Sequence, residues 1–185
     1  MNFVLHILRH GKAEQDSPTG RDRDRALKPR GERQALWIGE QLARSDSPPS
    51  LLVSSPYTRA RQTSEHFLEG FRAAIDQWKS RNPPPTPPRL IFDDRLEVGE
   101  DVSHALEVIT ENIRIAADSR GSLCLVGHNP QLELLIAALI RGIPPAPSPH
   151  PELRTGECYT LTLDDPDHPL TSTRLVRAHR LDDDD

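Results

Sequence analysis

The stretch "VLHILRHG" at residues 4–11 is an aliphatic run that ends abruptly in two polar side chains and a glycine. Its aliphatic residues alternate little with polar ones, which is typical of a parallel strand covered on both faces. In open α/β sheets, ligand sites lie just beyond the carboxyl ends of such strands. Arg9 and His10 are therefore placed to meet a ligand, although a strand whose polar end simply reaches water has the same pattern.

The rest of the chain alternates short apolar runs with amphipathic stretches. The apolar runs predict strands at 51–56, within 90–98 and at 122–126, followed by two strands at 158–163 and 171–179 that are candidates for a hairpin at the sheet edge. Helical spacing of apolar residues predicts helices over 32–44, 58–80, 101–119 and 131–142, and residues 12–31 form a long polar loop. This order predicts an α/β fold, a three-layer α/β/α sandwich with a mainly parallel central sheet.

Size and composition limit the classes of protein. A chain of 185 residues suits one domain, here residues 1–180, followed by a solvated acidic tail at 181–185. The net charge of −5 argues against a nucleic-acid partner. The longest later apolar run, at 134–140, is too short to span a membrane, and no leader segment is evident. We therefore expect a cytoplasmic protein without a membrane partner.

Cysteine and proline usage adds little chemistry. Cys124 and Cys158 do not make a disulfide framework, and no histidine and cysteine spacing suggests a zinc site. The proline-rich segments 81–89 and 144–151 are expected to form surface loops. The first of them could also recruit a proline-binding domain, but its composition identifies no partner.

Three predicted strands run directly into polar segments. These segments are "RHG" at 9–11, "SSPYTRARQT" at 54–63 and "GHNP" at 127–130. If the strands lie side by side and parallel, their tips converge on one site. Arg59, at the start of a helix, and His128 would then join Arg9 and His10.

This combination of residues suits phosphoryl transfer. Two arginines can hold a phosphate dianion, one neutral imidazole can attack phosphorus, and a second imidazole can donate to the phosphoryl oxygens. A nearby cation disfavours protonation of the attacking imidazole. Because the arginines supply the positive charge, no metal and no other cofactor is required.

Each residue alone also has an ordinary interpretation. His10 could be a satisfied histidine at a strand end, Arg59 an arginine on a helix surface, and His128 part of a helix cap. The remaining histidines have no partner at an informative spacing and are expected to be structural or solvent-facing: His6, His66, His104, His150, His168 and His179.

Taken together, "LRHG" at 8–11, "DRALKPRGERQA" at 24–35, "SSPYTRARQT" and "GHNP" resemble the histidine phosphatase superfamily, which is phosphoglycerate-mutase-like in fold. The resemblance covers about residues 2–163. It implies that His10 is the phosphorylated nucleophile, that Arg9 and Arg59 bind phosphate, and that His128 is the second catalytic histidine.

Within that superfamily, the short chain and the "RALKPRG" loop are most similar to the small phosphohistidine phosphatases of the SixA type. The resemblance implies a metal-independent phosphatase that removes phosphate from phosphohistidine on a partner protein. The alternatives are a broad phosphomonoesterase acting on small phosphate esters and a phosphoprotein-binding module without catalysis.

One position departs from the family pattern. Many members have a glutamate as general acid two residues after a leucine, and here Val98 occupies that position after Leu96. Glu97 is the candidate acid, with Glu100, Asp101 or water as alternatives. An alkoxide leaving group needs a proton in the transition state. An imidazole can depart as a neutral ring if its other nitrogen is already protonated, so the departure favours a phosphohistidine substrate.

Overall fold

The computed structural model describes residues 2–77, 84–118, 122–141, 152–165, 168–170 and 173–181. Within these ranges, six strands form one sheet in the order β3-β2-β4-β1-β5-β6. The strands are β1 (Phe3–Arg9), β2 (Pro49–Ser54), β3 (Arg89–Phe92), β4 (Ser122–Gly127), β5 (Cys158–Leu163) and β6 (Thr173–His179). The α-helices are α1 (Pro29–Ala43), α2 (Thr58–Gln77), α3 (Val102–Asp118) and α4 (Gln131–Arg141), with short 3-10 helices at Asp22–Asp24 and Asp94–Leu96.

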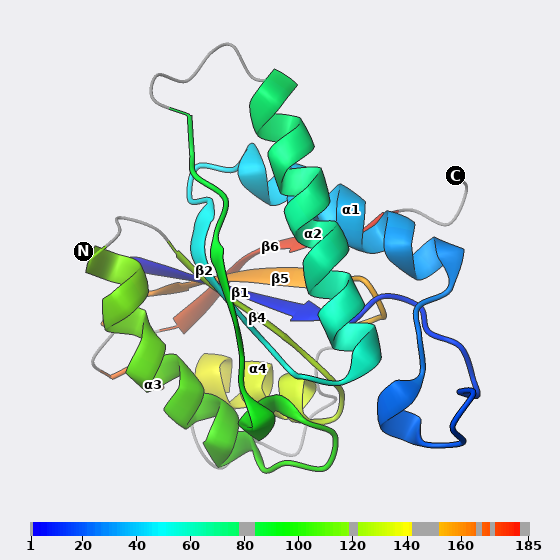
Figure 1. Ribbon diagram of the computed structural model, residues 1–185. Coiled ribbons are helices and arrows are strands. Elements are labelled where there is room, and N and C mark those ends of the chain that lie inside the picture. The colour runs from blue at the N-terminus through cyan, green and yellow to red at the C-terminus, as the bar shows by residue number, and fades with distance from the viewer. Residues whose placement is uncertain are drawn as a thin grey trace.

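The sheet is mainly parallel, as expected from the sequence. β3, β2, β4 and β1 are parallel neighbours, whereas β5 pairs antiparallel with both β1 and β6. Figure 1 shows α1 and α2 on one face of the sheet and α3 and α4 on the other. The three-layer sandwich and the final hairpin are therefore confirmed, with β3 and β6 as the edge strands.

Two apolar cores, one on each face, hold these layers together. Leu5 and Ile7 of β1 pack in the core with α3 and α4, whereas Leu8 packs in the core with α1 and α2. A strand buried on both faces explains the lack of alternation in the opening stretch. The largest fully buried side chains of α2 are Phe67 and Phe71, which stack with their ring centroids 6.0 Å apart.

Several predicted boundaries were wrong by a few residues. α1 begins at Pro29 rather than at residue 32, because proline suits the first helical position, where its missing N–H costs nothing. Gly31 therefore lies inside the first turn of α1. The expected strand within 90–98 ends at Phe92, after which the Asp93 carboxylate accepts a hydrogen bond from the Arg95 N–H and starts a 3-10 turn.

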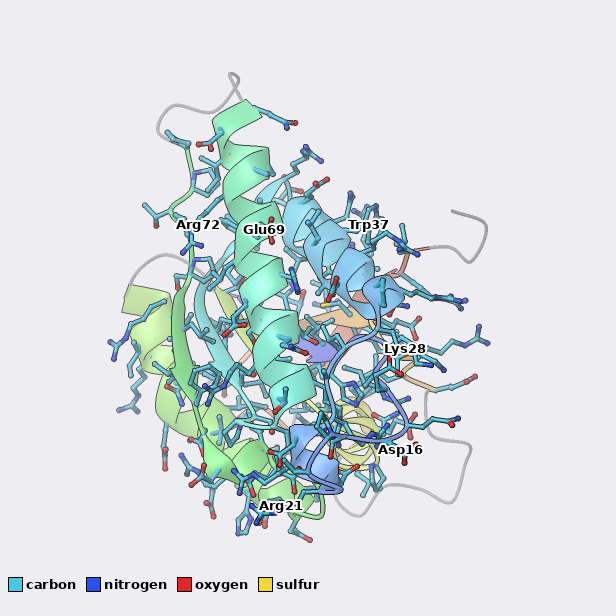
Figure 2. All side chains as sticks on the ribbon, turned by 45° about the vertical axis from the view of Figure 1, so that its right-hand side comes forward. Asp16, Arg21, Lys28, Trp37, Glu69 and Arg72 are labelled. Atoms are coloured by element: carbon cyan, nitrogen blue, oxygen red, sulfur yellow. The ribbon has the colours of Figure 1, made fainter. Side chains whose placement is uncertain are left out.

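The segment between β1 and α1 is more ordered than a simple polar loop. Residues 13 and 27 form an antiparallel bridge, and the 3-10 turn Asp22–Asp24 lies between them. Figure 2 shows Asp16, Arg21 and Lys28 along this segment. The loop is thereby held beside the carboxyl end of β1.

Some predictions fall on residues that are not described. The segment 144–151, residues 81–83 of the other proline-rich segment, the acidic residues 182–185 and the end of the predicted helix 58–80 lie outside the described residues. Among the described residues, no helix combines the length and the apolar character that crossing a membrane requires.

Candidate active site

The carboxyl ends of β1, β4 and β2 lie level with one another. In the sheet register, Arg9 of β1 is opposite Gly127 of β4, and Ser54 of β2 is opposite Val126. Beyond the strands, the His10 N–H donates to the Gly127 carbonyl at 3.1 Å. The three polar segments that follow these strands therefore meet at one edge of the sheet.

Arg9, His10, Arg59 and His128 line one cavity of about 450 Å³. The rings of His10 and His128 have their centroids 5.0 Å apart, and Arg59 Nε lies 3.3 Å from His10 Nε2. The sequence thus predicted correctly that these four side chains come together. The other lining residues are Lys12, Ala13, Gln15, Asp22, Arg25, Lys28, Val98, Asn129 and Thr155.

The hydrogen bonds of His10 define its tautomer. Its Nδ1 lies 2.8 Å from the Gly11 carbonyl oxygen, which can only accept, so Nδ1 carries the proton. Nε2 is then the basic nitrogen, and it accepts a hydrogen bond from Arg59. A nucleophilic lone pair therefore points toward the guanidinium that would also hold an anion.

Burial keeps His10 neutral. The residue is only 7% exposed, and burial lowers its pKa to about 3, with further lowering by Arg59, Arg9 and Arg25. The sequence suggested the arginines as the cause, whereas loss of hydration is the larger effect. At neutral pH the ring is an uncharged base.

Arg59 is held in place by a residue that the sequence did not single out. Its Nη1 donates to the Asp22 carbonyl at 2.8 Å, and its Nη2 donates to the Asp22 carboxylate at 2.9 Å. Burial raises the pKa of Asp22, but hydrogen bonds from Arg25 and Arg59 lower it overall. The resemblance of "DRALKPRGERQA" to the family begins just after this aspartate and was the nearest signal for it.

Arg9 presents a donor without a protein partner. Its Nη1 donates to the Leu153 carbonyl at 2.9 Å, while its Nε is buried and unpartnered among the described residues. A buried N–H without an acceptor is costly unless a ligand supplies one. This geometry suits a bound anion.

The second histidine is oriented by Ser55. His128 Nε2 lies 2.9 Å from Ser55 Oγ, and that oxygen already accepts from the Tyr57 N–H at 3.3 Å. The hydroxyl proton of Ser55 finds its acceptor among the described residues in His128 Nε2, which leaves the ring proton on Nδ1. That Nδ1 is buried and has no described partner, so it is a donor held for a ligand. Burial, followed by His10 and Arg59, lowers the pKa of His128 to about 2.

Two glycines let α1 pack directly on the strand tip. A Cβ on Gly31 would lie 2.2 Å from the Lys12 carbonyl oxygen, and a Cβ on Gly11 would lie 2.5 Å from the Gly31 carbonyl oxygen. Gln34 adds a hydrogen bond, because its Oε1 accepts from the Lys12 N–H at 3.0 Å. The backbone next to His10 is therefore fixed by the first turn of α1.

Glu97 does not line the cavity that holds His10. It lies in a neighbouring cavity of about 190 Å³ that shares His128, and its carboxylate is 3.9 Å from Arg23. Val98 lines the His10 cavity instead. Glu100 pairs with His104 at 2.6 Å, and Asp101 accepts from the Ser103 N–H. The role of Glu97 as general acid stays a prediction.

Other candidate groups have structural surroundings. His6 is buried, with its ring nitrogens within 3.0 Å of Thr160 Oγ1, Ser122 Oγ and the Ser47 carbonyl. Cys124 and Cys158 are both free and buried. In the part of the chain that the structure describes, no group of three or more His, Cys, Asp or Glu residues is arranged to hold a metal ion.

Part of the sequence is similar to known proteins. The model of the histidine phosphatase superfamily (branch 1) matches residues 5–80. An Arabidopsis thaliana chloroplast protein, itself uncharacterized, is 26% identical over 125 residues, which is 68% of this chain and 53% of that protein. This chain therefore spans about half the length of that relative.

The fold extends the similarity to nearly the whole chain. A structure described as phosphohistidine phosphatase SixA from Agrobacterium tumefaciens matches with a TM-score of 0.68 and 24% identity over 97% of this chain and 98% of that chain. The structure of the protein histidine phosphatase SixA complexed with tungstate matches with a TM-score of 0.70 and 19% sequence identity. The match covers 96% of this chain and 97% of that chain. The structure of a mycobacterial glucosyl-3-phosphoglycerate phosphatase matches with a TM-score of 0.65 and 18% sequence identity. The match covers 95% of this chain and 97% of that chain.

These matches fit the arrangement of the strand tips. The match over residues 5–80 includes Arg9, His10 and Arg59, and the shared fold brings His128 to the same edge of the sheet. Within residues 5–80 the chain is similar to the histidine phosphatase superfamily (branch 1), and over nearly its whole length it shares the fold of the SixA structures.

Proposed function

We propose that this protein is a metal-independent phosphatase that forms a phosphohistidine at His10 and dephosphorylates phosphohistidine on a partner protein. One observation carries the proposal: the unprotonated Nε2 of a neutral His10 lies in a cavity together with Arg9, Arg59 and His128.

The reaction has two steps. In the first, His10 Nε2 attacks phosphorus, the Nε2–P bond forms, and the P–N bond of the substrate phosphohistidine breaks, so that the substrate imidazole leaves. In the second, water attacks phosphorus, the Nε2–P bond breaks, and inorganic phosphate leaves with the oxygen of that water. One proton of the water is released to solvent or retained by phosphate, and His10 returns to its neutral state.

The surrounding residues stabilise the phosphoryl group in both steps. The Arg9 and Arg59 guanidiniums match the phosphoryl oxygens and balance their negative charge. Two hydrogen bonds to Asp22 hold the Arg59 guanidinium at the cavity. The Nδ1 proton of His128 donates to an oxygen whose charge grows during transfer.

The protein substrate is supported by the leaving-group chemistry. Where many family members have a glutamate, Val98 lines the cavity, and an apolar side chain supplies no proton. An imidazole leaving group needs less protonation than an alkoxide. The similarity to the SixA structures points in the same direction.

A small-molecule phosphomonoesterase is the second candidate function. The structural similarity to a mycobacterial glucosyl-3-phosphoglycerate phosphatase favours it. Glu97, which shares a cavity with His128, would then be the acid that protonates an ester leaving group. A module that only binds phosphoproteins has less support, because simple binding of a dianion does not require the basic Nε2 of His10.

The test is to trap the phosphoenzyme. The protein is mixed with a ³²P-phosphohistidine peptide and quenched in alkali, which preserves phosphohistidine. We expect label on the wild-type chain and on His168→Ala, a control at an exposed histidine, and no label or turnover with His10→Ala. Turnover that persists in His10→Ala would exclude this mechanism. A parallel panel of sugar and nucleotide phosphates separates the two substrate classes.

A further inference from the structure

Glu133 lies behind the anion site and is not among the residues that line the His10 cavity. It is in the first turn of α4, where an acidic side chain ordinarily stabilises the helix terminus. Here its Oε1 also accepts two hydrogen bonds from other segments, one from Asn129 Nδ2 at 2.7 Å and one from the Leu153 N–H at 3.0 Å. The carboxylate therefore joins the segment after β4 to the segment before β5.

The backbone of Leu153 links Glu133 to Arg9. Leu153 is fully buried, its N–H is bound to Glu133, and its carbonyl accepts from Asn129 Nδ2 at 2.9 Å. The same carbonyl accepts from Arg9 Nη1 at 2.9 Å. The position of this carbonyl, and with it the position of the Arg9 guanidinium, therefore depends on the anchor that Glu133 supplies.

The contact with Leu153 determines which edge of the Arg9 guanidinium is left for a ligand. A guanidinium can bind two phosphoryl oxygens through the edge that Nε and Nη2 form. Because Nη1 is bound to the Leu153 carbonyl, this edge stays available, and its Nε has no acceptor among the residues that the structure describes. Loss of the contact would leave the guanidinium free to turn.

The charge of Glu133 acts on the anion site in the opposite sense. Burial lowers the pKa of Arg9, and the negative charge of Glu133 is the largest effect that opposes this lowering. Glu133 is thus close enough to influence the site through its charge, and a carboxylate near a bound phosphate repels it. If Glu133 contributed only its charge, removing it would strengthen anion binding.

From these contacts we propose that Glu133 is a positioning residue, which holds the Leu153 carbonyl so that Arg9 presents its Nε and Nη2 edge to the phosphoryl group. The proposal rests on the proposed function, in which the phosphoryl group is the ligand of Arg9. It adds to the reaction a residue that acts only through the backbone of another segment.

The test compares two substitutions that both remove the charge of Glu133. Glu133→Ala also removes the acceptor, whereas Glu133→Gln keeps an oxygen that can accept both hydrogen bonds. We expect Glu133→Ala to bind inorganic phosphate about tenfold more weakly than the wild type, and kcat/KM for a phosphohistidine peptide to fall by a similar factor. Glu133→Gln should bind phosphate at least as tightly as the wild type, because the repelling charge is gone.

Three further variants separate positioning from a general structural role. In the Arg9→Lys background, Glu133→Ala should change the affinity for phosphate by less than about twofold, because no guanidinium remains to be oriented. Glu40→Ala is the matched control, since it removes a partly buried glutamate from the last turn of α1 and should leave the affinity for phosphate unchanged. Glu133→Met fills the space without supplying an acceptor, and it replaces Glu133→Ala if circular dichroism shows the alanine variant to be unfolded.

Three results would overturn the proposal. They are equal affinity for phosphate in Glu133→Ala and Glu133→Gln, the same loss from Glu133→Ala in the wild-type and Arg9→Lys backgrounds, and no binding of phosphate by the wild type. If the wild type binds phosphate but does not turn over the phosphohistidine peptide, the proposed function has failed, and the measured affinities alone decide the role of Glu133.

Discussion

Gly31→Ala should impair catalysis although residue 31 never touches the substrate. A Cβ at this position would lie 2.2 Å from the Lys12 carbonyl oxygen and 2.7 Å from the Lys12 nitrogen, whereas real Cβ contacts essentially never fall below 3.0 Å. Both clashing atoms are backbone and cannot rotate away. The first turn of α1 and the segment that follows His10 must therefore separate by about 1 Å.

The expected losses of rate and of stability in Gly31→Ala follow from that displacement. A misplacement of about 1 Å can reduce the rate about 100-fold when it moves a catalytic group. Overpacking of this kind costs roughly 1–3 kcal/mol of stability, whereas alanine in place of glycine within a helix gains about 1 kcal/mol. We expect kcat to fall by about two orders of magnitude and the free energy of unfolding to fall by at most about 2 kcal/mol.

The assay combines single-turnover phosphorylation of His10 with urea unfolding. Gly39→Ala is the control, because its Cβ would lie 2.0 Å from the Phe67 carbonyl oxygen at the α1–α2 contact and away from the site. Gly39→Ala should have a lower free energy of unfolding. Under conditions in which circular dichroism shows that it is folded, it should retain most of the rate of His10 phosphorylation. An unchanged rate in Gly31→Ala, or equal loss of rate in both variants, would refute the reasoning.

Four further predictions follow from the geometry and the pKa values. The ¹⁵N NMR shifts of His10 should show a neutral ring with its proton on Nδ1 at pH 5, because its pKa is about 3; an imidazolium at pH 5 would contradict this. His6→Leu should cost roughly 1–3 kcal/mol in urea unfolding at pH 7.5, since it leaves buried hydrogen-bonding groups unpaired. The folded-state pKa of His6 is lowered to about 4, so its contribution to stability is complete above pH 6.5 and is lost as the pH falls toward 4; His6→Leu should reduce that pH dependence. Ser55→Ala should slow phosphorylation of His10 about tenfold by releasing the second histidine, and a rate within twofold of wild type would show that the hydroxyl does not position it. Glu97→Gln should lower hydrolysis of alkyl phosphate esters about 100-fold and leave phosphohistidine hydrolysis within about twofold, and equal effects on both would exclude a selective acid role.

The sequence predicted the parts of the site that depend on local pattern. An unalternating apolar strand must be buried on both faces, and its first polar residue must then lie at the sheet edge. Applied to β1, β2 and β4, this rule predicts that Arg9, His10, Arg59 and His128 lie near one another, and all four line one cavity. This prediction does not require the order of the strands in the sheet, because the carboxyl ends of neighbouring parallel strands lie on the same side of the sheet.

The residues that the sequence missed depend on contacts between distant segments. Asp22 accepts a hydrogen bond from Arg59, which lies 37 residues later in the sequence. Gln34 donates to the carbonyl of Thr155, which lies 121 residues later. Within their own segments, both look like ordinary polar residues of a loop and a helix. Gly31 was predicted to precede α1, because its closeness to the Lys12 backbone leaves no trace in local propensity.

The cause of the neutral His10 shows why position in the fold matters more here than the neighbouring charges. Arginines at a solvated surface would be screened and would lower a histidine pKa only slightly. The level ends of three parallel strands instead bury the ring, and this loss of hydration is the largest influence on its pKa. Burial also strengthens the field of Arg9 and Arg59 at the site of the phosphoryl group, since the local dielectric is low. One feature, the depth at which the strands end, therefore supplies both the free nucleophile and the strong anion site. A substitution that opens this edge to water should weaken both together, even with all four side chains intact.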